Sequence, residues 1–228
     1  MRGTGVIEAQ LNEIERVLNL VNLCEERVSH QVEYIGGVIS IERTDGYRGA
    51  YEYCVSSRCF DFKLTNQSLL QFAWANKNIC TFRYLESPLD IPGYEEFVLD
   101  TLEVTSAELI EIGDSLREEY LQYCENAGLK RTILPIRYDY DCTAYKPGSH
   151  PAAHIHIGHS TPLRIESERK MNALSFVFFI LRHQFPREWL DVLDAVDNDT
   201  IARSIRDSLD LVPEEFRSET DRTHLKLC

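Results

Sequence analysis

The chain has 228 residues, of which 43% are hydrophobic and 10% aromatic, and these values are typical of a globular protein with a sizeable core. Its formal net charge of −13 argues against broad nucleic-acid binding, which requires a basic surface, and favours a protein partner with a basic surface. No apolar run reaches the roughly 18 to 20 residues of a membrane span, and the N-terminus lacks the apolar core of a signal peptide. We therefore expect a cytoplasmic protein that does not contact a membrane.

The cysteines indicate reduced thiols. There are seven, they are scattered along the chain, and none forms a Cys-x-x-Cys pair. Neither a disulfide framework nor a zinc ribbon is therefore expected.

The first third of the chain combines one helical pattern with several extended ones. Apolar residues at steps of three and four predict a long helix over residues 5–33. A strand is predicted over 38–42, and Thr44-Asp45-Gly46 has the composition of a hairpin turn. Aromatic and β-branched runs predict three further strands, over 51–55, 58–64 and 79–84. The run 68–75 fits either a strand or a helix.

The remainder begins with a helix predicted over 105–127, because Thr105 and Glu108 have the spacing of a capping box. Strands are predicted over 133–140 and 153–158, joined through the turn Lys146-Pro147-Gly148. After Arg164 the pattern becomes helical, over 171–183, 187–196 and 199–209, with Pro186 separating the first two helices and Trp189 packing at their junction.

This order of elements predicts an α+β fold, because the strands form one middle block with helices on either side. We expect a single domain over 1–228 with a central, mostly antiparallel sheet. A long N-terminal helix, a mid-chain helix and a C-terminal helical part over 171–210 flank the sheet-rich core of about 38–165.

The densest chemical feature is a histidine cluster, because four of the seven histidines fall between His150 and His159. If 153–158 is a strand, His154 and His156 point to one side of it, and the apolar residues between them point to the other.

The preceding strand alternates in the same way, with Arg137, Asp139 and Asp141 on one face and apolar or tyrosine residues on the other. Pairing of the two strands would bring the charged row beside the imidazoles. A carboxylate beside an imidazole fixes its tautomer, and guanidinium groups bind phosphate or carboxylate.

The catalytic hypothesis makes His154 and His156 the acid and the base, with Asp139 orienting one of them. Arg137, Arg164 and His150 are the candidate anion-binding residues.

A metal site is the second chemical hypothesis for the cluster, although nothing in the sequence requires a cofactor. His154 and His156 could share one divalent ion. Gly148 followed by His154-Ile155-His156 resembles the first motif of the cupin superfamily, which implies such a metal site. That motif also has a Glu four or five residues after the second His, where this chain has Ser160 and Thr161, and the nearest Glu is Glu166.

The same histidines also resemble the start of the histidine-triad nucleotide hydrolase motif. This resemblance implies that His156 is the nucleophile. The chain departs from the motif at Gly158, where that family has a third His, and His159 would point to the opposite face.

A broader resemblance covers most of the chain and rests on four segments between 137 and 189, namely Arg137–Asp141, His150–His156, Arg164-Ile165 and Phe176–Trp189. They look like a bacterial family known only as a domain of unknown function. The resemblance implies no established reaction. Proteins of this kind are often similar in setting to phage-defence (antiviral) or toxin–antitoxin components.

Two functions remain open at this stage. The net charge favours an interaction or regulatory component of a defence or toxin–antitoxin system, in which the histidine cluster is a structural hub and the acidic surface docks a basic protein. The clustered polar residues favour a hydrolase or nuclease-like effector that acts on a phosphate-bearing substrate through His154 and His156.

Overall fold

The fold is organised around a seven-stranded sheet in which every strand pairs antiparallel with the next one along the chain, in the order β1-β2-β3-β4-β5-β6-β7. The computed structural model describes residues 4–28, 34–101, 105, 108, 115–159, 163–196, 201 and 209–219. The strands are β1 (Cys24–Arg27), β2 (Phe62–Leu64), β3 (Leu69–Asn76), β4 (Ile79–Leu85), β5 (Ile136–Asp141), β6 (Ala153–Ile157) and β7 (Ile165–Glu166). This sheet and the helices around it confirm the predicted α+β class.

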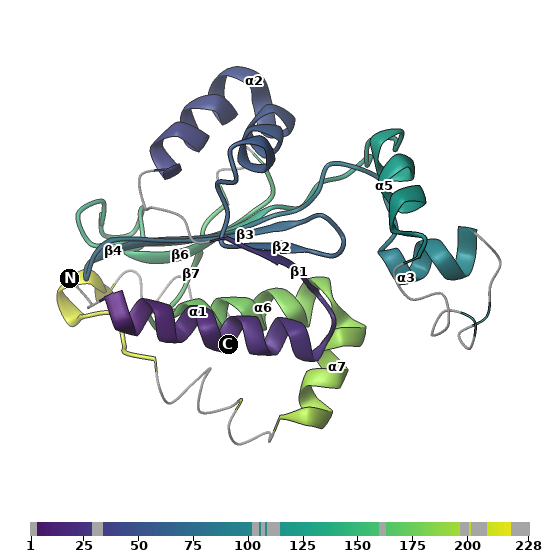
Figure 1. Ribbon diagram of the computed structural model, residues 1–228. Coiled ribbons are helices and arrows are strands. Elements are labelled where there is room, and N and C mark those ends of the chain that lie inside the picture. The colour runs from purple at the N-terminus through teal and green to yellow at the C-terminus, as the bar shows by residue number, and fades with distance from the viewer. Residues whose placement is uncertain are drawn as a thin grey trace.

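Helices cover both faces of the sheet. In Figure 1, α2 lies above the sheet and α1 and α6 lie below it, while α3 and α5 lie beyond one side. The helices are α1 (Thr4–Leu20), α2 (Tyr34–Ser56), α3 (Tyr94–Glu96) continued by the π-helical turn η1 (Phe97–Thr101), α5 (Arg117–Glu125), α6 (Ala173–Gln184), α7 (Pro186–Ala195) and the 3-10 turn η3 (Glu214–Phe216). Among the helices that the structure describes, none combines the length and the apolar composition that a membrane span requires.

The lower face of the sheet is an aromatic core. Phe72, Phe82 and Tyr138 are direct cross-strand partners on β3, β4 and β5, and each is almost completely buried. The ring of Phe82 stacks on Tyr138 at 5.6 Å between centroids and meets Phe176 of α6 at 5.9 Å. Burial of one such side chain stabilises the fold by about 2 kcal/mol, so this face holds α6 on the sheet.

α2 corrects three predictions, because the strand 38–42, the hairpin turn 44–46 and the strand 51–55 all lie within this helix. Tyr47, Ala50, Tyr51 and Cys54 are buried at steps of three and four. The packing of that stripe onto the sheet outweighs the strand preference of the residues. Gly46 interrupts the helix with φ 73° and ψ −174°, so the predicted turn signal marks a break in a helix.

The N-terminal helix is shorter than predicted. α1 ends at Leu20, Asn22 adopts a left-handed φ of 53°, and residues 24–27 form β1 instead of continuing the helix. The backbone N–H of Leu23 donates to Leu18 O at 2.8 Å, and this bond closes the helix end. Of the predicted helix, residues 29–33 lie outside the described residues.

The other strand predictions agree in place but not in length. The run 58–64 forms only the short β2, and the ambiguous run 68–75 is the strand β3. The strands predicted over 79–84, 133–140 and 153–158 correspond to β4, β5 and β6. β7 was not predicted as a strand.

The capping box at the predicted helix 105–127 is confirmed by reciprocal hydrogen bonds. Thr105 N–H donates to Glu108 at 2.7 Å, and Glu108 N–H donates to Thr105 Oγ1 at 3.3 Å. The helix described in this region is α5, over 117–125, and most of 106–114 lies outside the described residues.

The C-terminal helices α6 and α7 confirm the predictions over 171–183 and 187–196, with Pro186 as the first residue of α7. Trp189 packs on Phe178 with ring centroids 5.9 Å apart, as predicted for the junction. The predicted helix 199–209 falls almost entirely outside the described residues.

Candidate functional site

The predicted polar residues lie on the upper face of the sheet, opposite the aromatic core. Successive side chains of a strand point to opposite faces, so the neighbours of Phe82, Tyr138 and Ile155 share the other side. Two lines of direct cross-strand partners result there. They are Thr81–Asp139–His154 and Arg83–Arg137–His156.

Three of these side chains converge, as the pairing of β5 with β6 predicts. His154 Nε2 lies 3.0 Å from His156 Nε2, and Asp139 Oδ2 lies 3.4 Å from His156 Nε2 and 3.9 Å from His154 Nε2. We call these three residues the triad. In the part of the chain that the structure describes, they form a group whose ligand atoms all lie within 4.8 Å of one another.

The orientation of His154 is fixed by its backbone surroundings. Its Nδ1 lies 2.8 Å from the carbonyl oxygen of Pro151, and because a carbonyl only accepts, Nδ1 carries the proton. The lone pair of Nε2 therefore points toward His156 and Asp139. Burial is the main cause that lowers the pKa of His154 from 6.5 to about 4, and the neighbouring histidines act in the same direction. His154 is thus a neutral imidazole near pH 7.

Asp139 is held in its charged form. Burial alone would raise its pKa, but the hydrogen bond with His156 and the charge of Arg137 outweigh burial and, together with Thr81, lower the pKa to about 2. Arg137 Nε donates to Oδ2 at 2.8 Å, and the Thr81 hydroxyl donates to Oδ1 at 3.0 Å. The carboxylate is therefore both ionised and fixed in place.

The triad has the composition and spacing of a metal-binding site. Ligands at about 2.05 Å from one ion lie about 2.9 to 3.4 Å apart in octahedral or tetrahedral geometry. Two of the three separations already fall in that range, and a shift of roughly half an ångström would bring the 3.9 Å separation into it. Two imidazoles and a carboxylate suit zinc, iron or manganese. The Pro151 carbonyl, Arg137 and Thr81 are the outer partners that orient such ligands.

The same atoms also form a hydrogen-bonded hub. Since the Nε2 of His154 has only a lone pair, the contact at 3.0 Å requires His156 Nε2 to donate in the absence of an ion, and the same N–H also faces Asp139 Oδ2 at 3.4 Å. Metal binding would replace that hydrogen bond, so the two arrangements compete for the same nitrogen atoms.

The remaining predicted site residues lie around the triad. His150 packs edge-on against His154 at 4.9 Å between centroids, and its buried Nδ1 has no hydrogen-bond partner among the described residues. Arg164 is exposed and comes one residue before Ile165, which pairs with Ile155. Continuing that register would place Arg164 beside His156.

Neither the cupin motif, which has a Glu after its second His, nor the histidine-triad motif, which has a third His, is complete in the structure. Asp139, from the neighbouring strand, supplies the carboxylate that converges with the two histidines. Glu166 is the cross-strand partner of His154 on β7 and is not one of the three converging residues. Gly158 follows β6 with φ 85°, and His159 lies against Tyr47 of α2 at 5.4 Å. No third histidine therefore continues the His154–His156 row.

Sequence reasoning missed the contribution of β4. Thr81 and Arg83 alternate with the buried Phe82 and Tyr84, so the polar face of this strand was readable as an alternating pattern. The role of the Pro151 carbonyl could not be predicted from the sequence, because every residue has a backbone carbonyl and none is marked by its residue type.

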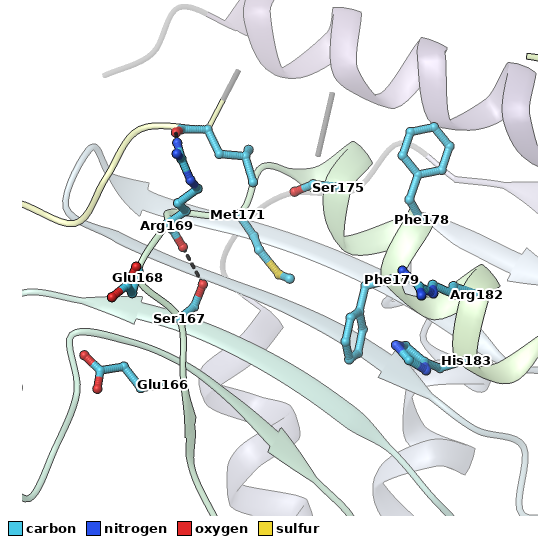
Figure 2. Close-up of a pocket in the computed structure, with 11 residues that line it drawn as sticks. Glu166, Ser167, Glu168, Arg169, Met171, Ser175, Phe178, Phe179, Arg182 and His183 are labelled. Atoms are coloured by element: carbon cyan, nitrogen blue, oxygen red, sulfur yellow. Dashed lines mark hydrogen bonds between the residues drawn. The ribbon is translucent and has the colours of Figure 1, made fainter. Parts of the chain in front are cut away.

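A separate cavity of about 420 Å³ lies between the segment around β7 and α6 (Figure 2). Met171, Phe178 and Phe179 give it apolar walls, and Arg182 and His183 lie near Phe179. Its lining also includes Glu166, Ser167, Glu168, Arg169, Ser175 and Leu209, and none of the triad. It was not predicted from the sequence.

Comparison with known proteins places the chain in a family but gives no activity. Searches of curated proteins and of solved structures found no match. A family model described as "Uncharacterized conserved protein (DUF2290)" matches residues 20–227, which include every residue of the triad. The chain therefore belongs to this family of uncharacterised conserved proteins, as its resemblance to a domain of unknown function predicted.

Proposed function

We propose that the protein is a divalent-metal-dependent hydrolase whose site is the triad. The observation that carries this proposal is the convergence of one ionised carboxylate and two imidazoles on a common point. A divalent ion held by three protein ligands keeps positions for water and can lower the pKa of that water to about 7. This is the chemistry that hydrolysis near neutral pH requires.

The protein residues then have distinct tasks. His154 presents a fixed, neutral Nε2 because Pro151 holds its other nitrogen. Asp139 contributes negative charge, and Thr81 and Arg137 keep its oxygens in position. The proposal makes the two histidines ligands, instead of the acid and base expected from the sequence.

Access to the site supports a reaction there. The side chain of His154 is only 2% exposed, whereas those of His156, Asp139 and Arg137 are 11%, 19% and 32% exposed. Exposure rises from His154 toward Arg137, so a substrate would approach from the arginine side.

The test is an assay of the metal-stripped protein with chromogenic phosphate and carboxylate esters, with and without Mn²⁺ or Zn²⁺. We expect hydrolysis that needs the ion and falls at least about a hundredfold in His156→Ala and Asp139→Asn. His183→Ala is the matched control, because His183 is exposed on α6 beyond the opposite face of the sheet. Activity that is indifferent to the ion, or equal in all variants, would contradict the proposal.

A second candidate, the interaction component, rests on the net charge of −13. In that role the triad is the hydrogen-bonded hub and the acidic surface docks a basic protein. Glu118 and Glu119 are exposed on α5 and provide the test. Reversing both to Lys should remove cross-links to a partner in cells, while His154→Ala should keep them. Unchanged cross-links in the reversed variant would count against this role.

A further inference from the structure

We propose that the substrate of this site is a phosphate monoester or another terminal phosphate, and that the two Nη nitrogens of Arg137 bind its phosphoryl oxygens. This inference rests on the proposed metal-dependent hydrolysis and specifies its substrate class. It comes from the place of Arg137 beside the triad, the charges around it and the number of oxygens that a phosphate offers.

Arg137 uses only part of its guanidinium within the protein. Its Nε donates to Asp139 Oδ2 at 2.8 Å, and the same oxygen lies 3.4 Å from His156 Nε2. No residue that the structure describes accepts a hydrogen bond from either Nη nitrogen, and the side chain is about one-third exposed. Two parallel donors are therefore accessible directly beside the triad.

The charges around Arg137 favour an anion. On the sheet, Arg137 lies directly between Arg83 and His156. Two like charges opposite each other on neighbouring strands are destabilising, and an anion on this line would relieve that repulsion. Among the described residues, Asp139 is the carboxylate hydrogen-bonded to Arg137, and it is also a proposed ligand.

Arg83 and Arg137 have different roles on this line. Arg83 is only 4% exposed, and its positive charge opposes the rise in the pKa of Tyr47 that burial causes. Its guanidinium therefore lies near α2, away from solvent. Arg83 adds positive charge, and Arg137 is the residue able to touch a substrate.

The number of phosphoryl oxygens selects the substrate class. A guanidinium fork engages two oxygens of an oxyanion through parallel hydrogen bonds. A terminal phosphate has a third oxygen that can reach the position between the triad nitrogens, whereas a carboxylate has none left. In the reaction, water attacks phosphorus and the bond from phosphorus to the leaving oxygen breaks. The proton lost by the water ends on the leaving oxygen, so a monoester gives an alcohol and inorganic phosphate, and another terminal phosphate gives its protonated leaving group and inorganic phosphate.

Because inorganic phosphate is the product, it serves as the probe. The full chain is loaded with Co²⁺, whose visible absorption reports the site, and is then titrated with inorganic phosphate. We expect the cobalt spectrum to change with phosphate, and Arg137→Gln to weaken phosphate binding about tenfold or more while saturating Co²⁺ remains bound.

Two further variants separate charge from geometry. Arg137→Lys keeps the charge without the fork, so phosphate should bind it more weakly than the wild type and more tightly than Arg137→Gln. Arg187→Gln removes an exposed arginine on α7, beyond the opposite face of the sheet, and should bind phosphate like the wild type.

The outcomes distinguish this inference from the proposed function. Cobalt binding without phosphate binding, or equal phosphate binding by the wild type and Arg137→Gln, would overturn the inference and leave the metal site standing. Absence of bound cobalt after dialysis would overturn the metal site. Calorimetry of phosphate with the metal-free chain then decides the anion site: binding that depends on Arg137 supports it, and absence of binding overturns it.

Discussion

The two faces of the central sheet are built from the same strands and have opposite chemistry. On β4 and β5, Phe82 and Tyr138 point down into an aromatic core. Thr81 and Asp139, each one residue away, point up, where Asp139 is part of the triad and Thr81 donates to it. The lower face is closed by α6 and is almost completely buried. The upper face keeps a gradient of exposure that ends at Arg137. Alternation along a strand thus gives stability to one face and leaves the other for chemistry.

This contrast separates two kinds of mutational effect. Changes on the lower face should alter the free energy of unfolding with little effect on ligand affinity. Changes on the upper face should alter ligand affinity with smaller effects on stability, apart from the protonation of His154.

Phe82→Ala should give the largest loss of stability. Phe82 is completely buried and contacts the rings of Phe72, Tyr138 and Phe176. Removing it leaves a cavity that should lower the free energy of unfolding by about 3 to 5 kcal/mol, measured by denaturant unfolding. The metal affinity of the folded fraction should stay within a few-fold of wild type. A loss below about 1 kcal/mol would mean that the core is packed elsewhere.

The pH dependence of the metal-free protein should show the cost of burying His154. Its pKa is 6.5 when unfolded and about 4 when folded, so the unfolded chain binds the proton first as the pH falls. The free energy of unfolding is therefore highest above pH 6.5, where His154 is neutral in both states. It falls progressively down to about pH 4, by about 3 kcal/mol in total.

Denaturant unfolding at a series of pH values measures this effect. His154→Gln removes the titrating group and should flatten the curve between those pH values. An equal slope in the variant and the wild type would show that another group is responsible.

His156→Ala distinguishes a metal ligand from a structural hub. If His156 is a ligand, Mn²⁺ affinity measured by calorimetry should fall about a hundredfold or more, while the metal-free protein loses about 1 kcal/mol with the hydrogen bond to His154. If the histidines are only a hub, the melting temperature falls and the wild type shows no Mn²⁺ affinity to lose. His183→Ala should leave both quantities unchanged.

Thr81→Val should produce the smallest effect. It removes the hydroxyl that donates to Asp139 Oδ1 at 3.0 Å and nearly preserves the shape of the side chain. Loss of such an outer partner typically weakens metal binding about tenfold, with a change in the free energy of unfolding near 1 kcal/mol. Unchanged Mn²⁺ affinity would show that Arg137 alone positions Asp139.

The convergence of the triad side chains could be predicted from the sequence because strand alternation is a local rule. His154 and His156 are two residues apart, and so are Arg137 and Asp139, so one pairing of β5 with β6 was enough to bring them together. The role of Thr81 depends on β4 lying beside β5, which the sequence did not predict. Arg83 lies in the run 79–84, which was predicted as a strand from its aromatic and β-branched residues alone. Thr81 and Asp139 are 58 residues apart in the sequence, and the local spacing of residues does not predict which distant strands pair.

The main errors have a common physical origin. Residues 38–42 and 51–55 are rich in β-branched or aromatic residues but form α2, because Tyr47, Ala50, Tyr51 and Cys54 bury one helical stripe on the sheet. Tertiary packing outweighed the intrinsic preference. Conversely, residues 24–27 continued the helical spacing of α1 but became β1, where Arg27 donates to Glu8 and Glu15 of that helix.

The most direct test is equilibrium dialysis of the metal-free protein against Zn²⁺ followed by elemental analysis. If the triad holds an ion, the wild-type protein should retain one zinc per chain. The double variant His154→Ala, His156→Ala should retain none. Absence of zinc from the wild type, or equal zinc in both proteins, would contradict the proposed metal site.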